Sequence, residues 1–125
     1  MSDGERVFTL EEANATLPDL RLRLAKIRDA REVVIRTSEL VKDQVVADGG
    51  GVASDRSYWE ASRILRAEVE HLADRGVVLR DPHSGLVDFL GEIDGRRVWL
   101  CWRLGEERVT HFHELGSGFA GRKPL

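Results

Sequence analysis

Residues 86–104 read LVDFLGEIDGRRVWLCWRL, and this stretch decides the fold. Apolar and polar residues alternate on both sides of Asp94-Gly95. An Asp-Gly pair between two alternating segments is a strong signal for a two-residue β-hairpin turn. Such a turn places Ile93 opposite Arg96 and thereby sets every other pair across the hairpin. The stretch predicts two antiparallel strands with a defined register.

This register sorts the side chains of the hairpin onto two faces. One face is apolar, and we expect it to pack against helices; it pairs Val87 with Trp102 and Phe89 with Leu100, beside Val98. The other face pairs Asp88 with Cys101, Leu90 with Trp99, Glu92 with Arg97 and Leu86 with Arg103. An antiparallel sheet that covers a core on one side is usually polar on the other. Asp88 beside a cysteine is the feature of that polar face that needs an explanation.

The segment before the hairpin has a helical period. Thr9 and Glu12 have the spacing of a capping box. Pro18 indicates either a short helix over residues 10–16 followed by a second helix, or one helix kinked at the proline. Apolar positions three and four residues apart then predict a long helix that ends before Gly49. Its stripe consists of Leu17, Leu20, Leu24, Ile27, Ala30, Val34, Thr37, Val41 and Val45.

A glycine-rich connector, residues 49–55, follows the long helix. It lacks the Lys-Ser/Thr ending of a phosphate loop, so we interpret it as a hinge. Ser57 and Glu60 repeat the capping-box spacing and start a shorter helix, which Gly76 ends. Two helices joined in this way fold back antiparallel, and part of the longer stripe then needs cover from the sheet or from a second copy. We therefore expect a homodimer through the first helix.

The predicted class is α+β in one domain, residues 1–125. It consists of a long N-terminal helical hairpin (9–75), a small antiparallel β-meander of three to four strands (77–115) and a C-terminal tail (116–125). The four candidate strands are residues 77–79, 86–93, 96–104 and 108–115. The change from a helical period to a period of two after Gly76 carries this prediction.

Composition narrows the functional classes. The 125 residues include 42% hydrophobic and 33% charged residues, as in ordinary globular proteins, and the net charge of -3 argues against nucleic-acid binding. The single cysteine cannot form an intramolecular disulfide, which fits a reducing compartment. No apolar run approaches the ~18 residues of a membrane span, and no signal-peptide core is present. We expect a cytoplasmic protein that does not contact a membrane.

The loop over residues 105–107 decides whether histidines join the polar face. With an odd number of residues, this loop places His111 opposite Cys101 and His113 opposite Trp99; with an even number, both histidines face the other way. Carboxylate, thiolate and imidazole are the ligand types of Zn²⁺ and related transition metals. With the odd loop, the candidate metal ligands are Asp88, Cys101, Glu106, His111 and His113.

The same residues also allow an interpretation without a ligand. The histidines can lie half-exposed on the sheet, Asp88 can pair with a nearby arginine, and Cys101 can be a small buried apolar residue. Catalysis by this thiol requires a neighbouring imidazole and an electropositive setting, and a thiol in the middle of a strand is seldom accessible. In the tail, Arg122 and the terminal glycines could hold an anion. We favour a tail that docks through Phe119.

Five motifs recur in a family that this chain resembles. They are FTLEEAN at 8–14 with Leu17-Pro18, GLVDF at 85–89, LCWRLGE at 100–106, Phe112-His113, and GFAGRKPL at 118–125. In this order they resemble a group of small bacterial proteins classed as a domain of unknown function. The family usually has Trp where this chain has Phe112.

The resemblance implies an α+β fold over almost the whole chain but no established activity. The positions that it points to are Asp88, Cys101, Glu106, His113 and Arg122. Because no catalytic set is recognisable, we predict a non-enzymatic binding or assembly protein, homodimeric through its first helix. The alternative is a metal-binding protein or a metal-dependent hydrolase that uses the Asp/Cys/Glu/His cluster.

Overall fold

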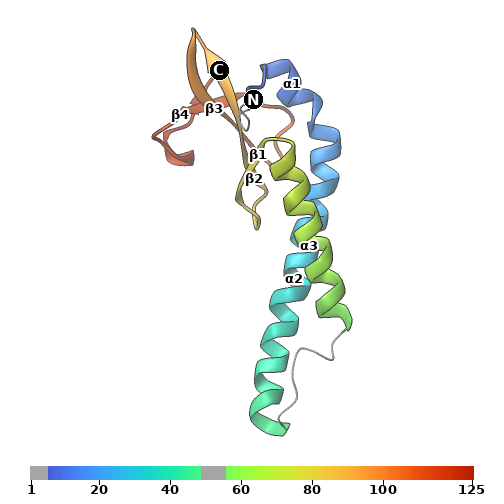
Figure 1. Cartoon of the computed structure of the whole chain (residues 1–125). Coiled ribbons are helices and arrows are strands. Elements are labelled where there is room, and N and C mark those ends of the chain that lie inside the picture. Colours follow the sequence, from blue (N-terminus) through green and yellow to red (C-terminus); the bar gives the residue numbers. More distant parts are fainter. Residues whose placement is uncertain (1–5, 49–55) are drawn as a thin grey trace.

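The structure is a computed structural model and describes residues 6–48 and 56–125. Three helices, α1 (Leu10–Ala15), α2 (Leu17–Asp48) and α3 (Arg56–Asp74), precede a five-stranded antiparallel sheet (Figure 1). The predicted α+β class is confirmed. None of the described helices combines the length and apolar character needed to cross a membrane.

The start of the helical part follows the capping signals. Thr9 Oγ1 accepts a hydrogen bond from Glu12 N at 3.0 Å, and Glu12 Oε1 accepts one from Thr9 N at 2.9 Å. This capping box starts α1, which ends before Thr16. Pro18 lies in the first turn of α2, where its missing N–H leaves no hydrogen bond broken. Of the two alternatives for this region, a short helix followed by a second one is therefore correct.

Helix α3 begins at Arg56, so the predicted start near Ser57 is confirmed to within one residue. Ser57 lies inside the first turn, however, and is not the N-cap. The predicted end is correct, because Gly76 follows the helix with a φ of 82°, in the left-handed region that glycine adopts readily. The predicted hinge, residues 49–55, lies outside the described part of the chain.

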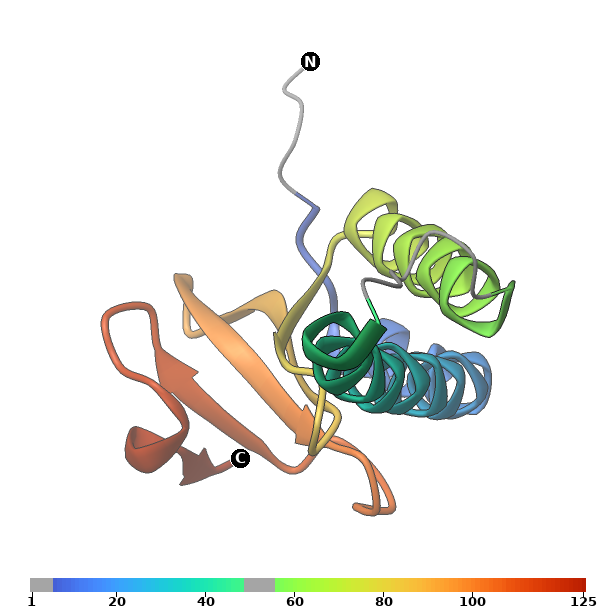
Figure 2. The same cartoon turned by 90° about the horizontal axis from the view of Figure 1, so that it is seen from below.

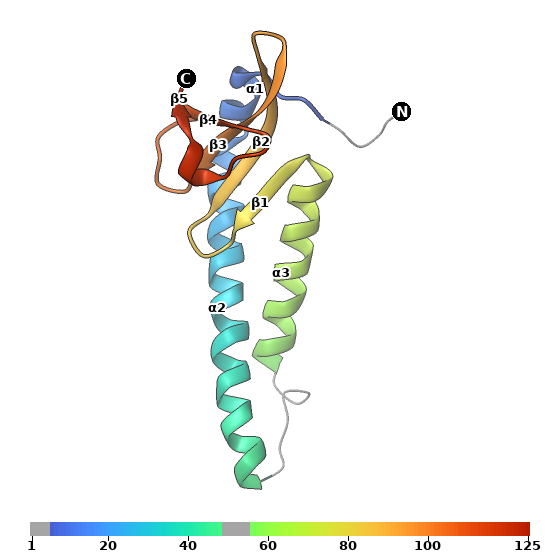
Figure 3. The ribbon, with the colours of Figure 1, turned by 90° about the vertical axis from the view of Figure 1, so that its left-hand side faces the viewer.

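Helices α2 and α3 lie side by side as an antiparallel hairpin (Figures 1 and 3). At about 1.5 Å per residue, α2 is roughly 48 Å long and α3 roughly 28 Å. The sheet lies beside the half of α2 that is nearer to its N-terminus (Figure 3). The other half of α2 extends beyond the sheet.

The strands follow chain order, β1-β2-β3-β4-β5, and each neighbouring pair is antiparallel. Their bounds are β1 (Val77–Asp81), β2 (Leu86–Ile93), β3 (Arg96–Arg103), β4 (His111–Glu114) and β5 (Lys123–Pro124). Seen from below, β4 and β5 lie at the edge of the sheet farthest from α3 (Figure 2). The tail thus supplies one strand more than predicted.

The hairpin register is as predicted, from Ile93 opposite Arg96 to Leu86 opposite Arg103. Asp94 has a φ of 51° and Gly95 a φ of 80°, and two successive positive φ angles are characteristic of a type I′ turn. The apolar face is buried against α1 and α2. Its side chains join one core with those of the helices: Phe8, Leu17, Leu20, Leu24, Ile27, Val87, Phe89, Val98, Leu100, Trp102 and Phe112.

Strand β4 is shorter than the predicted strand over residues 108–115, because the chain before it packs against α1. Val109 is buried and donates its backbone N–H to Asn14 Oδ1 at 2.7 Å. The ring Nε1 of Trp102 donates to the backbone oxygen of Glu106 at 3.1 Å. These contacts replace the ladder hydrogen bonds that a longer strand would make.

Candidate functional site

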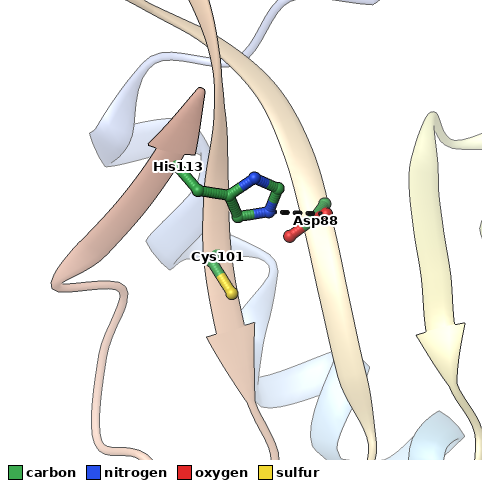
Figure 4. Close-up of side chains that lie close together, drawn as sticks. All are labelled: Asp88, Cys101 and His113. Carbon is green, nitrogen blue, oxygen red and sulfur yellow. Dashed lines mark hydrogen bonds and ion pairs between the residues drawn. The ribbon is translucent and has the colours of Figure 1, made fainter. Parts of the chain in front are cut away.

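Each of three neighbouring strands contributes one buried side chain with a potential ligand atom to the outer face of the sheet: Asp88 from β2, Cys101 from β3 and His113 from β4 (Figure 4). The register condition for this arrangement is met. His111 pairs with Cys101 and His113 with Trp99, as an odd connection requires. The connection itself is residues 104–110, longer than the predicted three residues but of the same parity.

The three side chains are buried although they lie on the polar face. Asp88 is 1% exposed, Cys101 1% and His113 2%. His113 Nε2 lies 3.0 Å from Asp88 Oδ2. The potential ligand atoms of the three residues all lie within 4.8 Å of one another. The group is therefore compact enough for one small cation to contact all three.

The hydrogen bonds around Asp88 leave one of its oxygens unused. Arg80 donates Nε–H to Asp88 Oδ2 at 2.8 Å, and His113 Nε2 faces the same oxygen. Among the described residues, no donor reaches the buried Asp88 Oδ1. A buried polar atom without a partner is unfavourable and is often explained by an ion or a water molecule.

Both ring nitrogens of His113 face oxygen atoms. Nδ1 lies 3.0 Å from the backbone oxygen of Glu114, which can only accept a hydrogen bond, so Nδ1 carries the proton. Nε2 then either carries a second proton towards Asp88 or offers its lone pair. A histidine that donates Nδ1–H to a carbonyl has the orientation and tautomer typical of metal-bound histidines.

Burial raises the pKa of the Cys101 thiol to about 12, and the negative charge of Asp88 adds to this effect. At neutral pH the thiol is protonated, which makes it a poor nucleophile. Nucleophilic catalysis by Cys101, which the sequence analysis disfavoured, is thus disfavoured by the burial of the thiol as well. A bound cation changes this balance, because a coordinating thiol loses its proton outright.

A cavity of about 350 Å³ lies over the three side chains. Its walls are Arg80, Leu86, Leu115, Ser117, Gly118 and Phe119, together with Asp88, Cys101 and His113. The expected pairing of Asp88 with a nearby arginine is confirmed, but the sequence did not identify that arginine as Arg80, nor the tail residues of this wall. The predicted first strand ended at residue 79, and only the pairing of β1 with β2 brings Arg80 to Asp88.

The other predicted site residues lie elsewhere. Glu106 pairs with Arg122, whose Nη2 lies 2.9 Å from Oε2, and it also accepts the backbone N–H of Arg103 at 2.8 Å. His111 is only half-buried, and its Nδ1 faces Thr110 Oγ1 at 2.9 Å. None of these residues belongs to the Asp88, Cys101 and His113 cluster.

The tail docks differently from the prediction. It is held by the pairing of β5 with β4 and by the ion pair between Arg122 and Glu106. Phe119 does not enter a groove; it is 38% exposed, with the guanidinium groups of Arg103 and Arg122 at 5.1 and 4.7 Å from its ring centre. Since Arg122 is already paired, it is a poorer anion site than predicted.

The fold and this cluster define a small α+β protein with a buried Asp-Cys-His group beneath a C-terminal loop. The family model DUF2203, described as an uncharacterized conserved protein, matches residues 6–125, and the chain belongs to this family. The predicted membership of a family of unknown function is confirmed. No curated protein and no solved structure matched the chain.

Proposed function

We propose that the protein binds a divalent transition-metal ion, Zn²⁺ in the first instance, through Asp88, Cys101 and His113. The single observation that carries this proposal is the compactness of the group. Three buried side chains of metal-binding types, from three strands, hold their ligand atoms within 4.8 Å of one another.

Two further features support a cation here. The unpaired Asp88 Oδ1 would gain a partner, which removes the penalty of a buried unsatisfied oxygen. The contact of His113 Nδ1 with the Glu114 carbonyl would hold the ring with Nε2 directed at the ion. Asp, Cys and His ligands together suit Zn²⁺, which accepts oxygen, sulfur and nitrogen donors.

Three protein ligands leave the fourth position of a tetrahedral Zn²⁺ site open. Sites of this kind are usually catalytic, because a water molecule held there ionises near neutral pH. The cavity of about 350 Å³ over the cluster offers room for such a water and for a substrate. We therefore propose a metal-dependent hydrolase as the more specific form of this function.

Elemental analysis of protein purified without an affinity tag tests the proposal. We expect about one equivalent of zinc in the unmodified protein and far less in Asp88→Asn, Cys101→Ser and His113→Gln. His111→Gln is the matched control, since His111 neighbours Cys101 across the strands but lies outside the cluster. Cobalt substitution adds a direct test of sulfur ligation, because a thiolate-to-Co²⁺ charge-transfer band should appear and should be absent in Cys101→Ser.

Thermal unfolding provides an independent measurement. Zinc at 100 times its dissociation constant should stabilise the folded state by about 2.7 kcal/mol. This gain should persist in His111→Gln and disappear in His113→Gln. Substoichiometric zinc, together with no rise in melting temperature on adding it, would overturn the proposal.

A second proposal concerns assembly: we infer that two copies associate through α2 and α3. Its carrying observation is a row of apolar side chains along one side of α2. Leu22 is 69% exposed and Leu40 63% exposed, and their spacing from Val33, eleven and seven residues, puts all three on one side of the helix. Large apolar side chains that share an exposed helix face often mark an interface.

The groove beside this row favours a second copy over a highly charged partner. It has a volume of about 580 Å³ and lies between α2 and α3. Both signs of charge line it: Lys26, Asp29, Glu60, Arg63 and Glu68. Glu68 already pairs with Arg23 at 2.8 Å within the chain. In a two-fold contact Asp29 and Glu60 of one copy can meet Lys26 and Arg63 of the other, so such a surface can be self-complementary.

Light scattering at micromolar concentration tests this association. We expect a dimer for the unmodified protein and a monomer for Leu22→Glu combined with Leu40→Glu. Ile35→Glu is the control, because the helical period places Ile35 on another side of α2, where it is also exposed. A monomeric unmodified protein would end this proposal.

A further inference from the structure

We infer that the cavity over Asp88, Cys101 and His113 takes a small anion whose oxygen atoms lie between the bound metal ion and the guanidinium of Arg80. This inference rests on the proposed metal site and specifies its ligand. Carboxylates and phosphates both provide negatively charged oxygen atoms that can bind a metal ion and accept hydrogen bonds. An oxyanion head would occupy the open metal position and accept hydrogen bonds from the arginine.

Arg80 is held in place and keeps its donors for a ligand. Its Nε–H is used by Asp88 Oδ2 at 2.8 Å, and its guanidinium lies 4.9 Å from the ring centre of Trp99. Within the described chain, its two terminal nitrogens make no hydrogen bond. An arginine fixed at Nε and on one face presents these nitrogens in a defined direction, the geometry that oxyanions bind in pairs of hydrogen bonds.

The charges of the occupied site favour an anion. A divalent ion and Arg80 together carry three positive charges, whereas the Asp88 carboxylate and the Cys101 thiolate carry two negative charges. One positive charge remains, shared between the buried ligand cluster and the side chain of Arg80, which is 42% exposed. A monoanionic head group would neutralise it.

The walls of the cavity indicate what the rest of the ligand is like. Leu86, Leu115 and Phe119 contribute apolar surface, while Ser117 adds a hydroxyl and Gly118 adds backbone. The volume of about 350 Å³ is near the lower limit of small-molecule sites, which span about 300–1,000 Å³. The fitting ligand is a small acid with a short apolar or aromatic body.

Titration calorimetry with two probes, benzoate and phenyl phosphate, tests this ligand class on zinc-loaded protein. We expect at least one probe to bind, and the better of the two identifies the head group as carboxylate or phosphate. Binding should weaken by roughly tenfold or more in Arg80→Gln, which loses a charge-assisted hydrogen bond. Arg103→Gln, which removes an arginine that contacts the Phe119 ring but does not line the cavity, should change it less than about threefold.

Zinc affinity measured on the same variants separates ligand binding from structural damage. Removing the positive charge of Arg80 should leave zinc binding unchanged or make it tighter, because like charges repel. A variant that is merely misfolded would lose both zinc and probe. Weaker probe binding together with unchanged or tighter zinc binding is therefore specific to the proposed role of Arg80.

Each negative outcome has its own meaning. Two results overturn the anion inference and leave the proposed metal site intact. In the first, the protein holds one equivalent of zinc but binds neither probe. In the second, Arg80→Gln binds the probes as tightly as the unmodified protein does. Protein that holds no zinc overturns both. Probe binding that survives removal of zinc by a chelator would also contradict the bridging position.

Discussion

The two faces of the central hairpin are built from alternate residues of the same strands, yet they differ in how their buried groups are satisfied. On the helix side, Phe89 and Trp102 are fully buried among apolar neighbours, and Phe8 stacks edge-on against Phe89 at 5.1 Å. On the outer side, Asp88 and His113 are buried just as deeply but depend on each other and on Arg80.

This difference separates stability from function. The helix side contributes through the area that it removes from water, and its side chains could be exchanged for others of similar volume. The outer side buries polar groups and leaves Asp88 Oδ1 unsatisfied, an arrangement that an apolar pair would avoid. A buried polar group that does not serve stability is a sign of a binding site.

The largest effect is expected from truncation on the helix side. Phe89→Ala removes a fully buried ring and leaves a cavity, so we expect a loss of about 3–5 kcal/mol in the free energy of unfolding. Urea denaturation measures it. Phe119→Ala is the matched control at an exposed phenylalanine and should cost below about 1 kcal/mol. Similar losses for both variants would contradict the described core.

The next effect concerns the outer face without metal. Asp88→Asn leaves the neighbouring His113 and Arg80 without their charged partner, and we expect a loss of about 1–3 kcal/mol. Replacing both buried partners, as Asp88→Leu with His113→Leu, should destabilise less than the single change, because no unpaired buried group remains and Arg80 can turn to solvent. Urea denaturation in the presence of a chelator measures both variants. A double variant less stable than Asp88→Asn would show that the pair itself stabilises the fold.

A smaller effect should come from the turn that orients both faces. Gly95 has a φ of 80° with open space where a Cβ would lie, so Gly95→Ala introduces backbone strain without a clash and should cost roughly 1–2 kcal/mol. Gly116→Ala is the control, since Gly116 also has open space but no positive φ. Both variants should keep their zinc. Loss of zinc in Gly95→Ala would indicate that the strands had shifted register.

The smallest effect is the pH dependence contributed by Cys101 in metal-free protein. The pKa of its thiol is raised from 9.0 to about 12 in the folded state, so the folded protein keeps a proton that the unfolded chain loses. This contribution to stability is complete below about pH 9 and is lost as the pH rises towards 12. By pH 10 the loss in the free energy of unfolding should amount to about 1 kcal/mol.

Urea denaturation between pH 8 and 10 measures this term as a difference from Cys101→Ala. The unmodified protein should lose stability relative to the variant as the pH rises. Parallel curves for the two proteins would show that the thiol is not as isolated from water as its burial indicates.

The hairpin and the helix boundaries near Pro18 and Gly76 could be predicted because their causes are local. A two-residue turn at Asp94-Gly95 leaves one register, and a proline or glycine acts on its own backbone. The wrong assignment of Ser57 as N-cap has a local cause too, since the same Ser/Glu spacing fits a cap and a first turn equally well.

The sequence did not decide on which face of the sheet His113 lies, because this depends on the path of residues 104–110. Their path is set by contacts with distant parts of the chain, such as the bond from Val109 to Asn14, and no local pattern specifies it. The identity of the arginine beside Asp88, Arg80, and the strand from the tail were not predicted, for the same reason. The register shift of the β1–β2 pairing at residues 79–81, and the pairing of β5 with β4, exist only once the sheet has assembled.

By itself, the sequence determined the α+β class, the hairpin register and the residue types that share the outer face, because alternation and turn chemistry act between neighbours. Only the tertiary structure decided that Asp88 and His113, 25 residues apart, meet at 3.0 Å while His111 and Glu106 turn elsewhere. Side chains from separate strands meet only through packing along the whole chain, and no single segment of the sequence specifies those contacts.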